Sequence, residues 1–92
     1  MSEALVRRRV VAHGRVQGVF FRDTVRREAQ RQGVQGWVEN RADGAVEAVL
    51  EGTADAVAAL VRLCERGPPG ANVERLEVFE EASEGLAGFS VR

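Results

Sequence analysis

The chain has 92 residues, of which 45% are hydrophobic and 29% are charged, and its formal net charge is −1. This length suits one domain around one core, and the composition is that of a soluble globular protein rather than a disordered one. No apolar run reaches the roughly 20 residues that span a bilayer, and the N-terminal MSEALVRRR lacks the apolar stretch of a secretory signal. We therefore expect residues 1–92 to form a single cytoplasmic domain without a membrane partner.

Cysteine and histidine are too scarce for a metal site or a disulfide. The only cysteine is Cys64, and there is one histidine, so neither an internal disulfide nor a structural zinc site is expected. Charge is unevenly divided: residues 1–41 hold nine arginines and four acids, and residues 42–92 hold four arginines and ten acids. The basic half could attract an anion or nucleic acid, or it could be an ordinary solvated surface.

The first predicted elements are a strand and a helix. Leu5–His13 is rich in β-forming residues and ends at Gly14, which predicts a strand with Val10 and Ala12 on one face. From about Phe21 to Gln32 apolar residues recur at i, i+4 and i+8, which predicts an amphipathic helix that Gly33 ends.

A hairpin and a second helix follow. Gly36–Arg41 and Ala45–Glu51 alternate like strands on either side of Ala42-Asp43-Gly44, a turn signal. Thr53 suits the N-cap of a helix over TADAVAALVRLCER, in which Cys64 falls on the apolar stripe and is expected in the core rather than as a nucleophile.

The C-terminal part predicts a loop and one or two strands. Gly67–Ala71 contains two prolines and must be a loop, Val73–Phe79 reads as a strand, and Gly88–Val91 as a further short strand. The order β-α-β-β-α-β predicts a ferredoxin-like α+β sandwich, an antiparallel sheet with two helices on one face. This fold hosts many functions and selects none of them.

The segment GRVQGVFFRD, residues 14–23, joins the first strand to the first helix. The first four N–H groups of a helix have no internal partner, and the helix dipole favours an anion there. Gly14 and Gly18 allow consecutive N–H groups to turn inward, and the forked guanidinium of Arg22 suits two phosphate oxygens. From these residues alone, a phosphate site and a simple glycine turn with a surface arginine both remain open. The segment lacks the Gly-Lys-Ser/Thr ending of a nucleotide P-loop and the third glycine of a dinucleotide-binding motif.

Three segments carry a resemblance to a known family. GRVQGVFFR, then GWVENRADGAVE, then GPPGANVERLEV resemble the acylphosphatase family, from about Arg8 to Arg92. The resemblance implies a ferredoxin-like fold and hydrolysis of small-molecule acyl phosphates to a carboxylate and inorganic phosphate, without metal or cofactor. We also expect a monomer.

The resemblance further implies which residues form the site. Arg22 would hold the phosphate, and Asn40 would position the attacking water. Backbone amides of the loop would bind the phosphate oxygens; these are the residues Arg15, Val16, Gln17, Gly18, Val19 and Phe20. From the residues alone, Asn40 reads equally as a turn residue before the hairpin loop.

Several other side chains are expected to be structural. His13 is interpreted as a strand-end residue rather than a nucleophile, and Asp23 as an acid that favours the helix dipole. Phe20 and Phe21 are expected as core and loop anchors, and Trp37 as a packed sheet residue. Arg7, Arg8 and Arg9 are expected to expose their head groups.

Two other functions fit parts of the sequence. A ferredoxin-like domain could bind an anion without turning it over, but the presence of both Arg22 and Asn40 favours the enzyme. RNA binding would suit the fold and the basic half, but the aromatic motif that RNA recognition needs on such a sheet is absent. No nucleic-acid partner is therefore expected.

Overall fold

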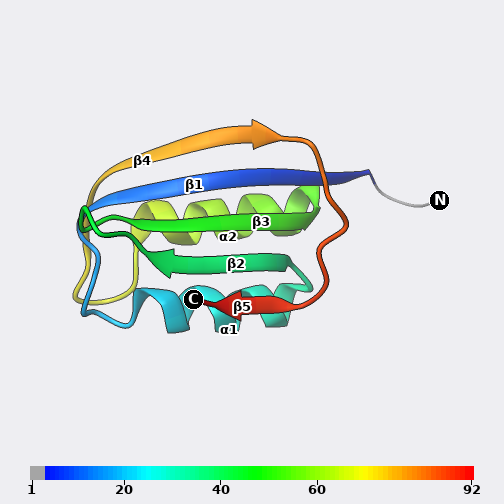
Figure 1. The fold of residues 1–92 in the computed structure, drawn as a ribbon. Helices are drawn as coiled ribbons and strands as arrows, with labels where there is room; N and C mark the ends of the chain where they lie inside the picture. The colour runs from blue at the N-terminus through cyan, green and yellow to red at the C-terminus, as the bar shows by residue number, and fades with distance from the viewer. Residues whose placement is uncertain (1–3) are drawn as a thin grey trace.

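The computed structural model describes residues 4–92. Its elements are β1 (Leu5–Arg15), α1 (Phe21–Gln32), β2 (Gln35–Asn40), β3 (Val46–Thr53), α2 (Ala54–Arg66), β4 (Asn72–Glu81) and β5 (Phe89–Val91). The strands form one sheet in the order β4-β1-β3-β2-β5, and both helices cover the same face of it (Figure 1). The predicted ferredoxin-like α+β sandwich is confirmed. The expectation of a cytoplasmic location rests partly on residues 1–3, which lie outside the described residues.

One strand pairs differently from the rest. The pairs β1–β3, β1–β4 and β2–β3 are antiparallel, as expected, but β5 pairs in parallel with β2 at the edge of the sheet. The sheet is therefore mixed, and β5 is an addition to the four-strand order. Among residues 4–92, no helix is long and apolar enough to cross a membrane.

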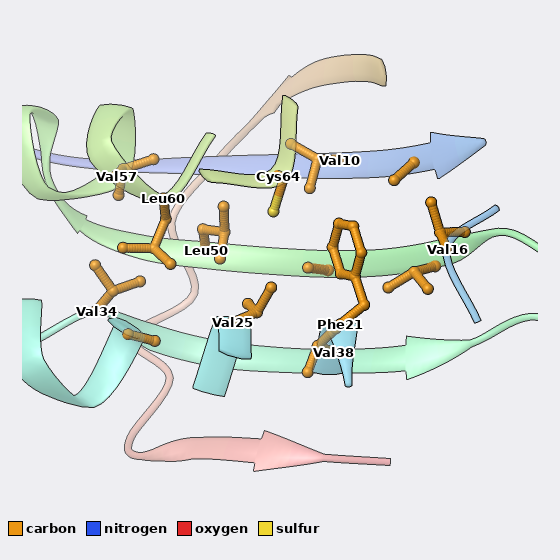
Figure 2. Close-up of a cluster of buried hydrophobic side chains, with 14 residues drawn as sticks. Val10, Val16, Phe21, Val25, Val34, Val38, Leu50, Val57, Leu60 and Cys64 are labelled. Carbon is orange, nitrogen blue, oxygen red and sulfur yellow. The ribbon is translucent and has the colours of Figure 1, made fainter. Parts of the chain in front are cut away.

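Local chemistry sets the end of α1 and the start of α2. Gly33 ends α1 in the left-handed conformation (φ 73°), and the hydroxyl of Thr53 accepts a hydrogen bond from the N–H of Ala56 at the start of α2. The helix-facing side of the sheet and the apolar stripes of the helices form one core (Figure 2). Cys64 is buried there, and burial raises the pKa of its thiol to about 12, so it is a core residue as expected.

The opposite face of the sheet corrects one prediction. Arg7 is buried rather than exposed, because Glu51 on β3 and Glu81 on β4 lie beside it in the register of the sheet. Its guanidinium pairs with Glu51 at 3.0 Å, Glu81 at 2.9 Å and Glu84 at 3.2 Å. Arg8 and Arg9 are partly exposed and also pair with acids.

Candidate active site

Connections from distant parts of the sequence meet at one end of the sheet. The loop 16–20 between β1 and α1, the hairpin turn after β2 and the C-terminal end of β5 all lie at this end (Figure 1). A cavity of about 520 Å³ lies here, lined by residues of the loop, the first turns of α1 and the ends of β2 and β5. Its lining residues are Val16, Gly18, Phe20, Phe21, Arg22, Asp23, Arg26, Asn40 and Val91.

The loop is shorter than the sequence predicted. Gly14 and Arg15 belong to β1 and pair with β4 after an irregularity in register at His13/Gly14. Gly14 has φ 122°, and a Cβ there would lie 2.3 Å from the carbonyl oxygen of Asn72, so only glycine allows this close approach. The loop itself therefore starts at Val16.

The backbone of the loop leaves donors without protein partners. Gly18 (φ 76°) and Phe20 (φ 61°) both adopt left-handed conformations, and α1 has no side-chain cap. Within residues 4–92, no group accepts a hydrogen bond from the backbone N–H of residues 16–20. Because the positive end of the α1 dipole lies at the same point, this segment can bind an anion through its backbone.

Arg22 lies in the first turn of α1 and lines the cavity. One Nη donates to the backbone oxygen of Arg92 at 2.8 Å. Arg92 is itself held, since its N–H donates to Val38 and its guanidinium lies 4.2 Å from the centre of the Trp37 ring. No Asp or Glu side chain in the described part of the chain forms an ion pair with Arg22, so its remaining donors are available to a ligand.

Asn40 ends β2 and reaches the same cavity from the other side. Its side chain is exposed and its amide has no hydrogen-bond partner among residues 4–92. The hairpin turn is held by other groups: the N–H of Arg41 donates to Ala45, and the Asp43 carboxylate accepts from the N–H of Ala45. The turn therefore does not depend on the Asn40 amide.

The six loop residues named from the sequence divide into two groups. Val16, Gly18 and Phe20 line the cavity, whereas Arg15, Gln17 and Val19 do not. Gln17 has another position: its Nε2 donates to the carbonyl oxygens of Arg41 at 2.8 Å and Ala45 at 3.0 Å. It thus fastens the loop to the hairpin that carries Asn40.

The two adjacent phenylalanines differ. Phe21 is buried in the core toward the same end of the cluster as Val16 (Figure 2). Phe20 is 81% exposed, so the expectation that it anchors the core is wrong. The reason is its left-handed backbone, which turns this residue away from the apolar stripe of α1.

Arg26 also lines the cavity and was not predicted as a site residue, although its position one helical turn after Arg22 could have indicated it. Its guanidinium is bound to Asp23 at 2.6 Å, and Arg27 pairs with the same carboxylate at 3.0 Å. The hydrogen bond from Arg26 is the main cause that lowers the pKa of Asp23. Asp23 is therefore an ion-paired helix residue and a poor general base.

His13 lies outside the cavity. Its Nε2 is 2.6 Å from a carboxylate oxygen of Glu77 on β4, and this contact lowers the pKa of Glu77. The structural interpretation of His13 agrees with this position.

The chain is similar to known proteins over nearly its whole length. The acylphosphatase family model matches residues 8–91. The acylphosphatase of Rubrobacter xylanophilus is 62% identical over 85 residues, which cover 91% of this chain and 77% of the relative. A solved acylphosphatase from Coxiella burnetii superposes with a TM-score of 0.91 at 38% identity, covering 96% of this chain and 93% of that one.

A similar fold also occurs inside a larger protein. Full-length HypF, in a phosphate- and nucleotide-bound form, matches with a TM-score of 0.92 at 25% identity, over 100% of this chain and 12% of HypF. The match to the family model and the near full-length similarity to curated acylphosphatases carry the conclusion. The chain belongs to the acylphosphatase family and is a hydrolase that cleaves the carboxyl-phosphate bond of acyl phosphates.

Proposed function

We propose that Arg22 and the backbone N–H groups of residues 16–20 bind the phosphoryl group, and that Asn40 positions the water that attacks it. The observation that carries this proposal is that Arg22 and Asn40, from different elements, line one cavity and have unused donors. The guanidinium offers a fixed fork for two phosphate oxygens. The amide of Asn40 offers a donor and an acceptor and does not titrate.

The chemistry requires little beyond positioning. The oxygen of water forms a bond to phosphorus while the bond from phosphorus to the acyl oxygen breaks, and the carboxylate leaves without needing a proton. The proton of the water passes to an oxygen of the substrate's own phosphoryl group. The protein then has to neutralise the phosphoryl oxygens and hold the water in line. No cofactor takes part in this scheme.

The same proposal covers the setting of the reaction. Residues 1–92 act as one acylphosphatase unit, monomeric and cytoplasmic, on a small-molecule acyl phosphate. Alkyl phosphate monoesters should be almost untouched, because nothing in the site expels an alkoxide. Acetyl phosphate and glycerol phosphate, assayed side by side with and without a chelator, test this scheme. Comparable rates on both, or loss of activity with the chelator, would contradict it.

The role of Asn40 has a test of its own. Asn40→Ala should lower kcat about a hundredfold, roughly 3 kcal/mol, because the amide acts mainly in the transition state. The inhibition constant for inorganic phosphate should change less than threefold. Asn72→Ala, at another exposed strand end outside the cavity, is the control and should match the parent. If Asn40→Ala keeps the circular dichroism spectrum of the parent and its kcat is within threefold of the parent, another group positions the attacking water.

A further inference from the structure

Phe20 combines two features that are unfavourable in a folded protein. Its ring is 81% exposed, and it is the only residue other than glycine with positive φ among residues 4–92. A phenylalanine in this conformation is strained, and an exposed ring gains little from burial. Strain of this kind gathers at functional sites, where the surrounding structure holds it.

The surrounding structure does hold the backbone of Phe20. Its carbonyl oxygen accepts two hydrogen bonds from Thr24, from the backbone N–H at 3.0 Å and from the hydroxyl at 2.8 Å. The conformation is therefore fixed by the first turn of α1, and the exposed ring is attached to a rigid point. This rigidity matters for recognition, because little ordering remains to be done when a ligand binds.

The ring lines the same cavity as the residues that receive the phosphoryl group. The exposed apolar part of the lining comes from Phe20 and from Val91, which is 42% exposed. The polar part comes from Gly18, Arg22, Asp23, Arg26 and Asn40, and Asp23 and Arg26 are paired with each other. A cavity of about 520 Å³ falls in the range that holds a whole small molecule rather than one phosphate group. The acyl group of a bound substrate must extend away from the phosphoryl group, and the side chains of Phe20 and Val91 line the cavity where they can contact it.

We propose that Phe20 is a specificity-determining residue whose ring packs on the acyl group, and that the preferred substrates carry a bulky apolar acyl group, aromatic above all. This inference rests on the proposed phosphate site. An aromatic acyl group would pack against the ring in an offset or edge-to-face arrangement, which adds to the apolar area removed from water. A small acyl group such as acetyl offers little apolar area to pack on the ring.

The test compares two substrates and two variants. Kinetic constants for acetyl phosphate and benzoyl phosphate are measured for the parent, Phe20→Gly and Phe20→Leu. The parent should favour benzoyl phosphate in kcat/KM. Phe20→Gly should lower the benzoyl-to-acetyl ratio of kcat/KM at least tenfold, mainly through a higher KM for benzoyl phosphate. Phe20→Leu, which restores an apolar side chain, should recover part of the loss.

A stability measurement separates recognition from a structural role. Phe20→Gly relieves the left-handed strain, so its Tm should equal or exceed that of the parent. Phe79→Ala, at an exposed phenylalanine on β4 outside the cavity, is the matched control and should leave the substrate ratio unchanged.

Two results would overturn the inference. One is an unchanged benzoyl-to-acetyl ratio in Phe20→Gly; the other is an equal loss on both substrates together with a lower Tm, which would make Phe20 a support of the loop. Acetyl phosphate turnover by the parent tests the proposed function separately. If the parent hydrolyses neither substrate, the proposed function fails and this inference fails with it.

Discussion

Arg7 and Arg22 lie toward opposite ends of the sheet and differ in what their guanidinium groups contact. Arg7, near the start of β1, is buried and paired with three carboxylates. Arg22, in the first turn of α1, donates to the main-chain oxygen of Arg92 and pairs with no Asp or Glu side chain of the described residues. Burial by itself lowers the pKa of Arg7, but hydrogen bonds to Glu81 and Glu51 outweigh it and raise that pKa.

The difference shows how one residue type serves the fold at one end and the reaction at the other. The donors of Arg7 are consumed by acids that would otherwise be charged and partly buried, so removing Arg7 damages the fold. The donors of Arg22 are left for a ligand, so replacing it damages binding and turnover. Stability and activity should therefore separate between these two positions.

The largest effect is expected for Arg22→Lys. The charge is kept, but the fork that fits two phosphate oxygens is lost, so kcat/KM for acetyl phosphate should fall about a thousandfold, roughly 4 kcal/mol. Affinity for inorganic phosphate should fall with it, while Tm should stay within about 5 °C of the parent, since only one exposed hydrogen bond is disturbed.

The control for Arg22→Lys is Arg62→Lys, at an exposed position of α2 outside this cavity, which should match the parent in all three measurements. Phosphate affinity within threefold of the parent in Arg22→Lys would return Arg22 to the surface-arginine interpretation.

The second largest effect is expected for Arg7→Met, which should lower stability and leave activity nearly unchanged. Arg7→Met should destabilise the protein by about 3 kcal/mol, which lowers Tm by more than about 10 °C. The low end of the range for breaking a buried pair applies because Glu51 also accepts hydrogen bonds from the backbone N–H groups of Glu84, Gly85 and Leu86. At a temperature where the variant is folded, kcat/KM should stay within threefold.

The neighbouring Arg8 provides the control for Arg7→Met. Arg8 pairs at 3.5 Å with a largely exposed Glu80, so Arg8→Met should cost less than about 1 kcal/mol. Equal losses in the two variants, measured by chemical denaturation, would mean that the burial of Arg7 contributes nothing.

Features set by local sequence were predictable, and features set by distant partners were not. The helix Phe21–Gln32 was predicted with its observed bounds, because its periodicity and the stop at Gly33 are both local. The burial of Arg7 was missed because its partners Glu51 and Glu81 follow it 44 and 74 residues later, and only the sheet register brings them together. The ends of β4 and the parallel pairing of β5 were missed for the same reason.

The site shows the same division. Arg22 and Asn40 were named from their motifs, and the structure places both on one cavity. The link from Gln17 to the hairpin was not predicted, because it spans 24 and 28 residues and depends on how the loop closes. The exposure of Phe20 was not predicted either, because a left-handed phenylalanine has no signal in the sequence pattern.

The Gln17 link offers a smaller effect at the active end. Gln17→Ala should lower kcat about tenfold, roughly 1.4 kcal/mol, because Asn40 directly precedes Arg41, whose carbonyl Gln17 holds. The inhibition constant for phosphate should change less than threefold. Gln17→Glu keeps the size but cannot donate to the two carbonyls, so it should lose as much as alanine does. Normal kcat in Gln17→Glu would show that these hydrogen bonds do not position Asn40.

The smallest effect concerns pH and the Arg7 end. Burial alone would raise the pKa of Glu51, but hydrogen bonds from the backbone N–H of Glu84 and from Arg7 outweigh it, so this pKa lies below its usual range. Because the unfolded carboxyl titrates near pH 4.3, the charged Glu51 contributes its full stability well above that pH. The contribution disappears as the pH falls from there through the lower pKa of the folded state.

Tm should therefore be nearly constant from about pH 6 to pH 8 and fall below about pH 5, with Glu28, Glu77 and Glu81 adding to the fall because their pKa values are also lowered. Glu51→Gln keeps the shape of the side chain, and Arg7 still pairs with Glu81 and Glu84. We expect it to lower Tm at pH 7 by about 5 °C, or about 1 kcal/mol. If the charge on Glu51 is what stabilises this end of the sheet, the gap between the two Tm curves must narrow as the pH falls toward 3. A difference in Tm that stays constant over this range would mean that Glu51→Gln destabilises the protein through lost packing. Burial, and not the charge of Glu51, would then distinguish the Arg7 end of the sheet from the Arg22 end.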